Sequence, residues 1–312
     1  MSGINLIETE ILVIGGGAAG MAAASAAAVG GLDVLLCDER DRPGGILPQC
    51  IHSGFGSGRF GAEMTGPEYC ERESEAFLAS GAAYLPETRV LSLNSDRTAV
   101  ISGPQGLQKV SFRECILAAG CREKPLWSLP VAGTRPEGIF TAGEAQEMTN
   151  LGHMDIGDDV FILGSGDIGM IMARRFALLG KNVIGIAECR DRLGGLRRNQ
   201  QECIEAYGIP VYLRSTVTEV HGYPRIGSVT LHHLDSGADE VIACSTLITS
   251  LGLVPEQSLA EPLMTGGRLP GWLHMCGNAE KVHEIADSVS AEGERLGKEL
   301  AEKKSGVTRS GD

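Results

Sequence analysis

Two glycine-rich turns of one design occur in this chain of 312 residues, and each is followed by an acid. Their glycines are Gly15, Gly17 and Gly20 in the first copy and Gly164, Gly166 and Gly169 in the second. In this spacing the first glycine permits a tight turn, the second lets a diphosphate approach the backbone, and the third lets a helix pack on a strand. Free N–H groups at the start of that helix attract the diphosphate. The pattern therefore predicts chemistry that begins with holding a dinucleotide.

The two acids stand where a ribose would be held. Asp38 comes 21 residues after Gly17, and Glu188 comes 22 residues after Gly166. An acid at this point accepts hydrogen bonds from ribose hydroxyls. A Gly-Gly pair follows each acid, and the first of these pairs is Gly44–Gly45. A single G-x-G-x-x-G turn is weak evidence, but two copies with the same surroundings predict two dinucleotide sites.

The segments around the turns form repeating strand–turn–helix units. Ile11–Ile14 and Val160–Leu163 are apolar runs of strand length that end directly before a turn. Two further apolar segments, Phe112–Gly120 and Cys244–Glu256, would each return the chain beneath a bound dinucleotide. Near the end of the sequence we expect a short strand, a turn and a helix from about Ala279 onward. The predicted fold class is therefore α/β, with two Rossmann-like dinucleotide-binding domains.

The composition is ordinary for a soluble globular protein, with 43% hydrophobic and 21% charged residues. The net charge of −13 disfavours nucleic acid and anionic lipid as partners, because both select basic surfaces. No stretch has the length and hydropathy of a membrane span, and the N-terminus shows no signal-peptide pattern. We therefore expect a cytoplasmic protein that is not integral to a membrane.

The nine cysteines include no C-x-x-C pair, and zinc-ribbon and ferredoxin spacings are absent. The seven histidines show no ligand spacing with acids. We therefore expect no metal site.

The order of these motifs resembles the flavoprotein reductases with two dinucleotide-binding domains, the broad group that includes thioredoxin reductase. More narrowly, it is similar to the FAD/NAD(P)-dependent oxidoreductases of glycerol operons, which accompany a glycerol-3-phosphate dehydrogenase. It is also similar to the flavoprotein subunits of opine, hydroxyproline and cyanide-forming dehydrogenases. The segments that carry the match span nearly the whole chain and include GGILPQCIHSGFG, MTGPEY, ILAAGCRE, GTRPEGIFTAGEAQ, ILGSGDIGMIMARR and CGNAEKVHEIADSVSAEGE.

This resemblance implies two Rossmann-like domains of three layers each, the second inserted into the first. The FAD-binding domain would comprise residues 1–124 and 257–312. Residues 125–150 would connect it to an NAD(H)-binding domain of residues 151–256. The cofactors would be FAD and NAD(H). NADP(H) is disfavoured because Glu188 would repel a 2′-phosphate.

The resemblance also assigns residues to the cofactors. The first turn and Asp38 would hold the ADP half of FAD, and Val90 would lie by the adenine. Relatives use a Gly-Asp pair near the C-terminus to contact FAD, and here that pair reads Gly277–Asn278, without the acid. The expected cofactor-binding residues are Gly15, Gly17, Gly20, Asp38, Gly44, Gly45, Val90, Gly120, Gly277 and Asn278 for FAD, and Gly164, Gly166, Gly169 and Glu188 for the nicotinamide nucleotide.

Two residues are candidates for side-chain chemistry. Related disulfide reductases carry a redox cysteine pair after the Gly-Gly, at positions that here hold Leu47 and His52, so we expect no dithiol relay. Cys50 would act as a single redox thiolate oriented by His52, or it would be a buried thiol beside the flavin. His283 and Asp287 are four residues apart and would share one face of the last helix.

These observations support three hypotheses of different classes. The first is an FAD-dependent, NADH-linked oxidoreductase that serves as the electron-transfer subunit of a larger, oligomeric dehydrogenase. Its partner would be a subunit with the substrate site or an iron–sulfur protein. The second is a stand-alone peroxide or disulfide reductase that uses Cys50. The third is a nucleotide-binding subunit without catalytic activity.

Overall fold

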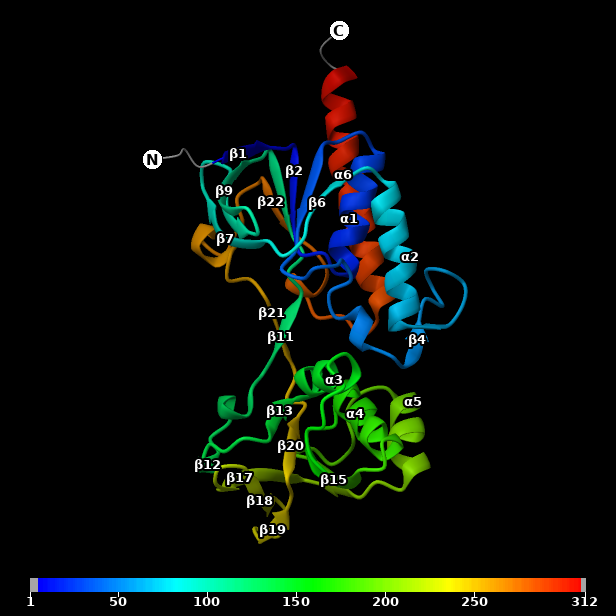
Figure 1. Ribbon diagram of the computed structural model, residues 1–312, viewed down its shortest axis with the longest axis vertical. Coiled ribbons are helices and arrows are strands. Elements are labelled where there is room, and N and C mark those ends of the chain that lie inside the picture. Colours follow the sequence, from blue (N-terminus) through cyan, green and yellow to red (C-terminus); the bar gives the residue numbers. More distant parts are fainter. Residues whose placement is uncertain (1–4, 310–312) are drawn as a thin grey trace. The chain divides into compact units, whose positions relative to one another are not determined.

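Figure 1 shows the computed structural model of the protein, which describes residues 5–309. The chain forms two compact units. The first unit comprises Met1–Arg122 and Pro255–Asp312, and the second comprises Glu123–Val254, so the second is inserted into the first. The two connecting strands, β11 (Cys121–Glu123) and β21 (Leu253–Pro255), pair with each other.

The centre of the first unit is a parallel sheet of five strands in the order β22-β10-β2-β3-β6. Sheets of this kind are buried on both faces, which explains why strands such as β2 are continuous apolar runs. The strands are β2 (Ile11–Ile14), β3 (Val34–Cys37), β6 (Ala83–Leu85), β10 (Glu114–Leu117) and β22 (Leu273–Met275).

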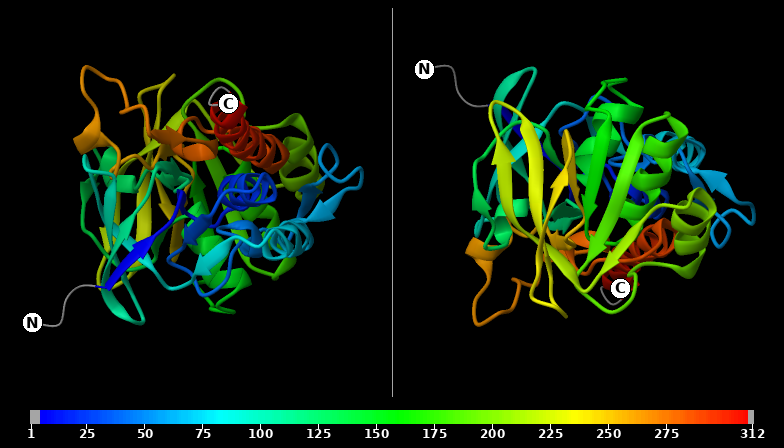
Figure 2. Two further views of the ribbon diagram at one scale, coloured as in Figure 1. Left: turned by 90° about the horizontal axis from the view of Figure 1, so that it is seen from above. Right: turned by 90° about the horizontal axis from the view of Figure 1, so that it is seen from below.

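Three helices cover one face of this sheet, and Figure 2 shows them side by side in blue, cyan and red. They are α1 (Ala18–Val29), α2 (Gly66–Ala79) and α6 (Ala286–Arg309). The small residues of α1 let α6 approach closely. A side chain at Gly293 would overlap the Ala19 carbonyl oxygen, and one at Gly297 would overlap that of Ala23. The Ala-rich segment is therefore a buried packing surface.

A smaller sheet of order β1-β9-β8-β7 lies over the other face and shares a hydrophobic core with it. Its strands are β1 (Asn5–Glu8), β7 (Arg89–Asn94), β8 (Thr98–Gly103) and β9 (Gly106–Ser111). A hairpin of β4 (Ser53–Phe55) and β5 (Met64–Thr65) lies before α2. The first unit thus has three layers, with helices, a parallel sheet and a second sheet.

The second unit repeats this plan with a parallel sheet of order β13-β20-β14-β15-β16. Its strands are β13 (Ile139–Thr141), β14 (Asp159–Leu163), β15 (Asn182–Glu188), β16 (Val211–Leu213) and β20 (Thr246–Thr249). Helices α3 (Ala142–Asn150) and α4 (Asp167–Leu178) share one core with it, and a short helix α5 (Arg197–Asn199) follows β15. A second sheet, of order β12-β17-β18-β19, shares a second hydrophobic core with the parallel sheet. Its strands are β12 (Ala132–Gly133), β17 (Ser215–Gly222), β18 (Ile226–His233) and β19 (Asp239–Ala243).

The last helix begins at Ala286, so the expectation of a helix from about Ala279 is wrong. Residues 277–279 form a short 3-10 turn instead. Gly277 has φ +62°, the left-handed conformation that glycine adopts without strain at this turn. The Asn278 side-chain oxygen accepts a hydrogen bond from the His283 N–H at 2.9 Å, which holds the segment as a loop.

The expectation that His283 and Asp287 share one face of the last helix is also wrong. His283 lies before the helix, and its Nε2 is 2.6 Å from Oε2 of Glu292. The Asp287 carboxylate instead accepts the N–H groups of Gly56, Gly58 and Arg59 at 2.9, 2.7 and 3.2 Å. The start of α6 therefore holds a loop more than 200 residues away in the sequence, as the separations of 228 to 231 residues show.

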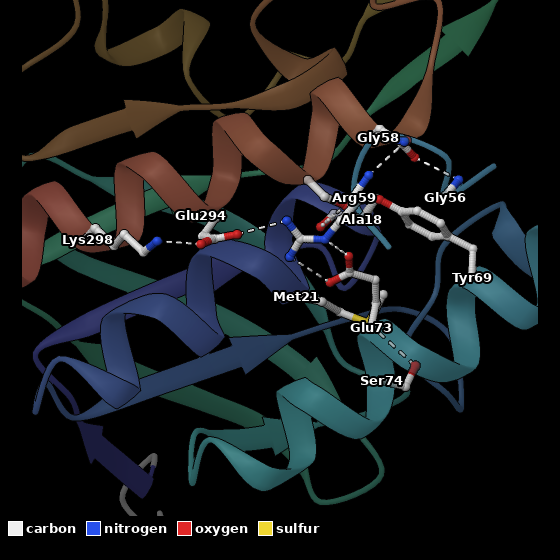
Figure 3. A network of polar contacts seen from close by, with 12 residues as sticks. Ala18, Met21, Gly56, Gly58, Arg59, Tyr69, Glu73, Ser74, Glu294 and Lys298 are labelled. Atoms are coloured by element: carbon white, nitrogen blue, oxygen red, sulfur yellow. Dashed lines mark hydrogen bonds and ion pairs between the residues drawn. The ribbon is translucent and has the colours of Figure 1, made fainter. Parts of the chain in front are cut away.

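Arg59 secures the same loop to two helices (Figure 3). Its guanidinium donates to Glu73 on α2 and, at 2.8 Å, to Glu294 on α6. Only 2% of Glu73 is exposed. Burial raises the pKa of Glu73, while the hydrogen bond and charge of Arg59 act in the opposite direction. The Arg59 guanidinium therefore offsets only part of the cost of burying this carboxyl group.

Replacing Arg59 by Met should lower the free energy of unfolding of the first unit by about 3 kcal/mol, because Glu73 is left buried without its partner. Urea unfolding followed by the fluorescence of Trp272 measures this, in a Trp127→Phe background since the chain has two tryptophans. The double variant Arg59→Met/Glu73→Gln should regain much of the loss. Equal midpoints for the parent and the Arg59→Met variant would contradict the role of this ion pair.

Candidate functional site

The first glycine turn joins β2 to α1 and requires glycine at two positions for the backbone itself. Gly15 has φ +99°, and a Cβ there would lie 2.5 Å from the Ala118 carbonyl oxygen. A Cβ at Gly20 would overlap the Gly15 carbonyl oxygen. These two glycines allow the turn and the contact of the helix with the strand.

Gly17 is glycine for a different reason. It is the N-cap of α1, and its φ of −74° is open to any residue. Beyond its chain neighbours, the nearest described atom to an added Cβ is the Gly45 Cα at 4.0 Å. The missing side chain leaves open space at a helix N-terminus, which is what an approaching diphosphate requires. We call this turn together with Asp38 the first cradle.

Asp38, at the end of β3, ties the first cradle together. Its Oδ2 accepts the N–H of Gly16, and its Oδ1 accepts the N–H of Arg40 at 2.7 Å. The Gly44 N–H donates to the Gly16 carbonyl at 2.7 Å. These hydrogen bonds within the protein therefore fix Asp38, the glycine turn and the Gly-Gly segment to one another.

The second turn joins β14 to α4 with the same geometry. Gly164 has φ +95°, and a side chain there would overlap the Ser250 carbonyl oxygen. A Cβ at Gly169 would lie 2.9 Å from the Gly164 carbonyl oxygen. Gly166 is the N-cap of α4 with φ −63°, and a Cβ there would meet the movable Ser250 hydroxyl at 2.9 Å. This turn and Glu188 form the second cradle.

Glu188 ends β15 and is bonded back to its turn through Ser165. Its Oε2 accepts the Ser165 N–H at 3.2 Å and the Ser165 hydroxyl at 2.6 Å. Its Oε1 accepts the Arg190 N–H at 3.0 Å. Burial raises the pKa of this acid, but hydrogen bonds from Ser165, Arg190 and Cys189 together outweigh burial, so its pKa lies below the ordinary value. Glu188 is therefore ionised at neutral pH.

Other residues expected at FAD gather around the first turn of α1. Gly45 has φ +55°, and a Cβ there would lie 3.0 Å from the Gly17 Cα. A Cβ at Gly277 would lie 2.7 Å from the Cβ of Ala19. Gly44, with φ +133°, faces the Cys70 sulfur. Backbone without side chains thus approaches the first cradle from two distant parts of the sequence.

The remaining three expected FAD residues are placed less directly. Val90 is buried in β7 opposite Ile101. Gly120 has φ +74°, and its carbonyl accepts the Glu256 N–H at 3.0 Å. The Asn278 side chain is engaged by the protein, since its Nδ2 lies 3.6 Å from the Cys121 sulfur and its oxygen caps the His283 N–H.

Cys50 is a buried thiol. It is 6% exposed, it donates to the Ile46 carbonyl at 3.4 Å, and burial raises its pKa to about 12. His52 places Nδ1 3.0 Å from the Ser53 carbonyl, with its ring centroid 5.3 Å from that of Phe55. At neutral pH Cys50 is therefore a neutral thiol and a poor nucleophile.

Sequence reasoning missed Ser165, Gly16 and Ser250, which complete the two cradles. The residue between the first two glycines differs between the copies, Gly16 in one and Ser165 in the other, and that difference was visible in the sequence.

Sequence reasoning also missed a cavity of about 200 Å³ beside the edge strand β13. It is lined by Pro125, Leu126, Trp127, Arg135, Pro136, Ile139, Phe140, Thr141, Glu144 and Thr249.

Within residues 5–309, no three His, Cys, Asp or Glu side chains are grouped so as to hold a metal ion. No helix in the described part of the chain is long and apolar enough to cross a bilayer.

A model of the pyridine nucleotide-disulphide oxidoreductase family matches residues 9–269. The chain belongs to this family. FAD and NAD(P)H are the cofactors of the family and of this protein, which is an oxidoreductase. The space beside Gly17, the N-cap position of Gly166 and the acid bonded to each turn fit a dinucleotide in each unit.

Curated relatives include the HcnB component of hydrogen cyanide synthase from Pseudomonas aeruginosa, 26% identical over 81% of this chain and 58% of the relative. An opine oxidase subunit from Agrobacterium tumefaciens is 28% identical over 80% of this chain and 54% of the relative. The chain thus spans a little more than half the length of these relatives.

Among solved structures, the thioredoxin reductase of T. acidophilum superposes with a TM-score of 0.77 at 19% identity. The match covers 95% of this chain and 99% of that one. The L-proline dehydrogenase of P. horikoshii gives a TM-score of 0.67 at 16% identity, over 98% of this chain and 57% of that one. These similarities confirm the predicted fold class of two Rossmann-like domains, the second inserted into the first.

The burial of Cys50 makes a labelling prediction. In the native protein near neutral pH, iodoacetamide should modify the exposed Cys189 well before Cys50, because the reagent reaches an accessible thiol first. Burial raises the pKa of both thiols, so accessibility decides the order. Peptide mass spectrometry over a time course measures both rates, and labelling in urea provides the fully accessible control. Native Cys50 reacting as fast as Cys189 would contradict this description of the thiol.

Proposed function

We propose that this protein is the FAD-dependent, NADH-linked electron-transfer component of a larger dehydrogenase. The observation that carries the proposal is the repetition of one complete cradle, with glycine turn, helix N-terminus and bonded acid, in each of two units. When bound, the flavin and the nicotinamide supply hydride-transfer chemistry. The chain's own residues would hold and orient each cofactor.

We assign FAD to the first unit and NAD(H) to the second. Gly45 and Gly277 approach the first cradle closely, so backbone without side chains borders the place that a long flavin nucleotide would take. The N-terminal end of α1 places free N–H groups and the positive end of a helix dipole at the predicted diphosphate position. The second cradle offers the same elements at α4.

The second cradle favours NADH over NADPH. Glu188 is ionised and held in place by Ser165 and by the Arg190 N–H. A free 2′-hydroxyl can donate to this carboxylate, whereas a 2′-phosphate would meet its negative charge.

The names of the relatives support a role within a larger assembly, since the hydrogen cyanide synthase and opine oxidase proteins are both called subunits. We propose that the partner is a dehydrogenase subunit with the substrate site or an iron–sulfur protein. An oligomeric assembly and a cytoplasmic location stay predictions.

The buried neutral thiol of Cys50 speaks against a stand-alone reductase that uses this residue. The intact second cradle speaks against a nucleotide-binding protein without catalytic activity.

Two matched variants test the assignment of the cradles. Gly17→Ala should weaken FAD binding about tenfold or more, because the added methyl enters the predicted diphosphate space. For the same reason, Gly166→Ala should raise the NADH concentration that half-bleaches the flavin by a similar factor. Both positions have backbone angles that alanine adopts, so folding should be retained. Flavin absorption of the purified variants and anaerobic bleaching by NADH are the measurements.

Gly227→Ala, at an exposed position of β18, is the control and should change neither property. A parent protein that takes up neither FAD nor NADH would overturn the proposal. So would a Gly17→Ala variant that retains FAD but loses NADH, since the assignment of the two units would then be reversed.

Coenzyme preference provides a separate test. The parent should use NADH at lower concentrations than NADPH, and Glu188→Ala should raise the KM for NADH about tenfold while changing that for NADPH much less. Initial rates with an artificial electron acceptor measure both constants. A parent that prefers NADPH would show that Glu188 does not contact the ribose as proposed.

The proposed role in a larger dehydrogenase predicts a stable complex. Purification of the protein from its native source should yield flavin absorption together with one or more co-purifying chains, which mass spectrometry identifies. Isolation of the protein alone, with full turnover of a peroxide or a small disulfide, would replace this role by that of a stand-alone enzyme.

A further inference from the structure

Ser165 occupies a position in the second cradle that has no side chain in the first. It lies between Gly164 and Gly166 and is only 1% exposed. Its hydroxyl donates to Glu188 Oε2 at 2.6 Å and accepts the Gly194 N–H at 2.7 Å. One side chain therefore links the turn, the acid and the second Gly-Gly segment.

The first cradle performs these tasks with the main chain alone. There the Gly16 N–H donates to Asp38, and the Gly16 carbonyl accepts the Gly44 N–H at 2.7 Å. The second cradle has the longer acid Glu188 in place of an aspartate, and the Ser165 hydroxyl takes over the acceptor role toward Gly194. The serine and the glutamate thus replace a glycine and an aspartate as a matched pair.

Four donors meet the Glu188 carboxylate, from the Ser165 N–H, the Ser165 hydroxyl, the Arg190 N–H and the Cys189 thiol. A carboxylate offers about four lone-pair positions. The thiol is the weakest donor of the four, lies at 3.4 Å and belongs to an exposed side chain. A ribose hydroxyl can therefore take its position while the other three donors keep the carboxylate in one orientation.

We propose that Ser165 is a positioning residue for the coenzyme, holding Glu188 so that one carboxylate oxygen faces the adenosine ribose. This inference rests on the proposed NAD(H) site in the second unit. Ser165 acts through Glu188 and has no part in hydride transfer. Its loss should therefore weaken binding of the adenosine half and leave the chemical step unchanged.

The experiment measures binding of ADP-ribose by calorimetry to the FAD-loaded protein, in which the first cradle is already filled. Ser165→Ala should weaken ADP-ribose binding about tenfold. It should raise the KM for NADH similarly, with kcat changed by less than about twofold. Ser165→Thr, which keeps the hydroxyl, should restore most of the affinity. Ser236→Ala is the control, because Ser236 lies in an exposed turn of the same unit and also bonds the backbone.

Each outcome decides a separate point. Equal ADP-ribose affinity of the parent and Ser165→Ala overturns the role of Ser165 and leaves the coenzyme site standing. A lower kcat with an unchanged KM also overturns it. A parent that binds no ADP-ribose overturns the proposed NAD(H) site itself. If Ser165→Ala unfolds at a lower temperature than the parent, Ser165→Gly, which copies Gly16, provides the same measurement.

Discussion

The arrangement of both units depends on one hydrogen-bonded link, from the acid at the end of a strand back to the N–H after the first glycine of the neighbouring turn. Asp38 makes it to Gly16, and Glu188 makes it to Ser165. The link joins adjacent parallel strands at their carboxyl ends, where ligands of such sheets bind. It fixes the acid and the helix N-terminus relative to each other, so the negative and positive ends of a site are set by the fold.

The glycines of the two turns serve two physical needs. Gly15 and Gly164 have left-handed backbone angles that other residues adopt only with strain. Gly17 and Gly166 have ordinary angles; Gly17 leaves room at its helix N-terminus, and at Gly166 the nearest atom is the movable Ser250 hydroxyl. This distinction makes alanine at the second position informative, since it removes space and leaves the backbone conformation accessible.

The fold class and both turns could be predicted because they depend on local spacing, with strand, glycines and acid inside about thirty residues. FAD and NAD(P)H follow from the family and agree with the expectation, whereas the individual cofactor-binding residues remain predictions. The start of α6 and the partner of Asp287 could not be predicted. The first depends on the Asn278 side chain, which accepts the His283 N–H, and the second on a contact with a loop 228 to 231 residues away. Ser165 was overlooked because its role appears only when the two cradles are compared in three dimensions.

The insertion of one unit into the other has a consequence for biosynthesis. The second unit is continuous in the sequence, while the first takes β22 and α6 from residues after the insertion. On the ribosome, the inserted unit is therefore complete and free to fold while its host still lacks an edge strand and a covering helix. Gly277 and the Asp287 contact arrive with those last elements, so the nascent chain can complete its second unit before its first unit exists.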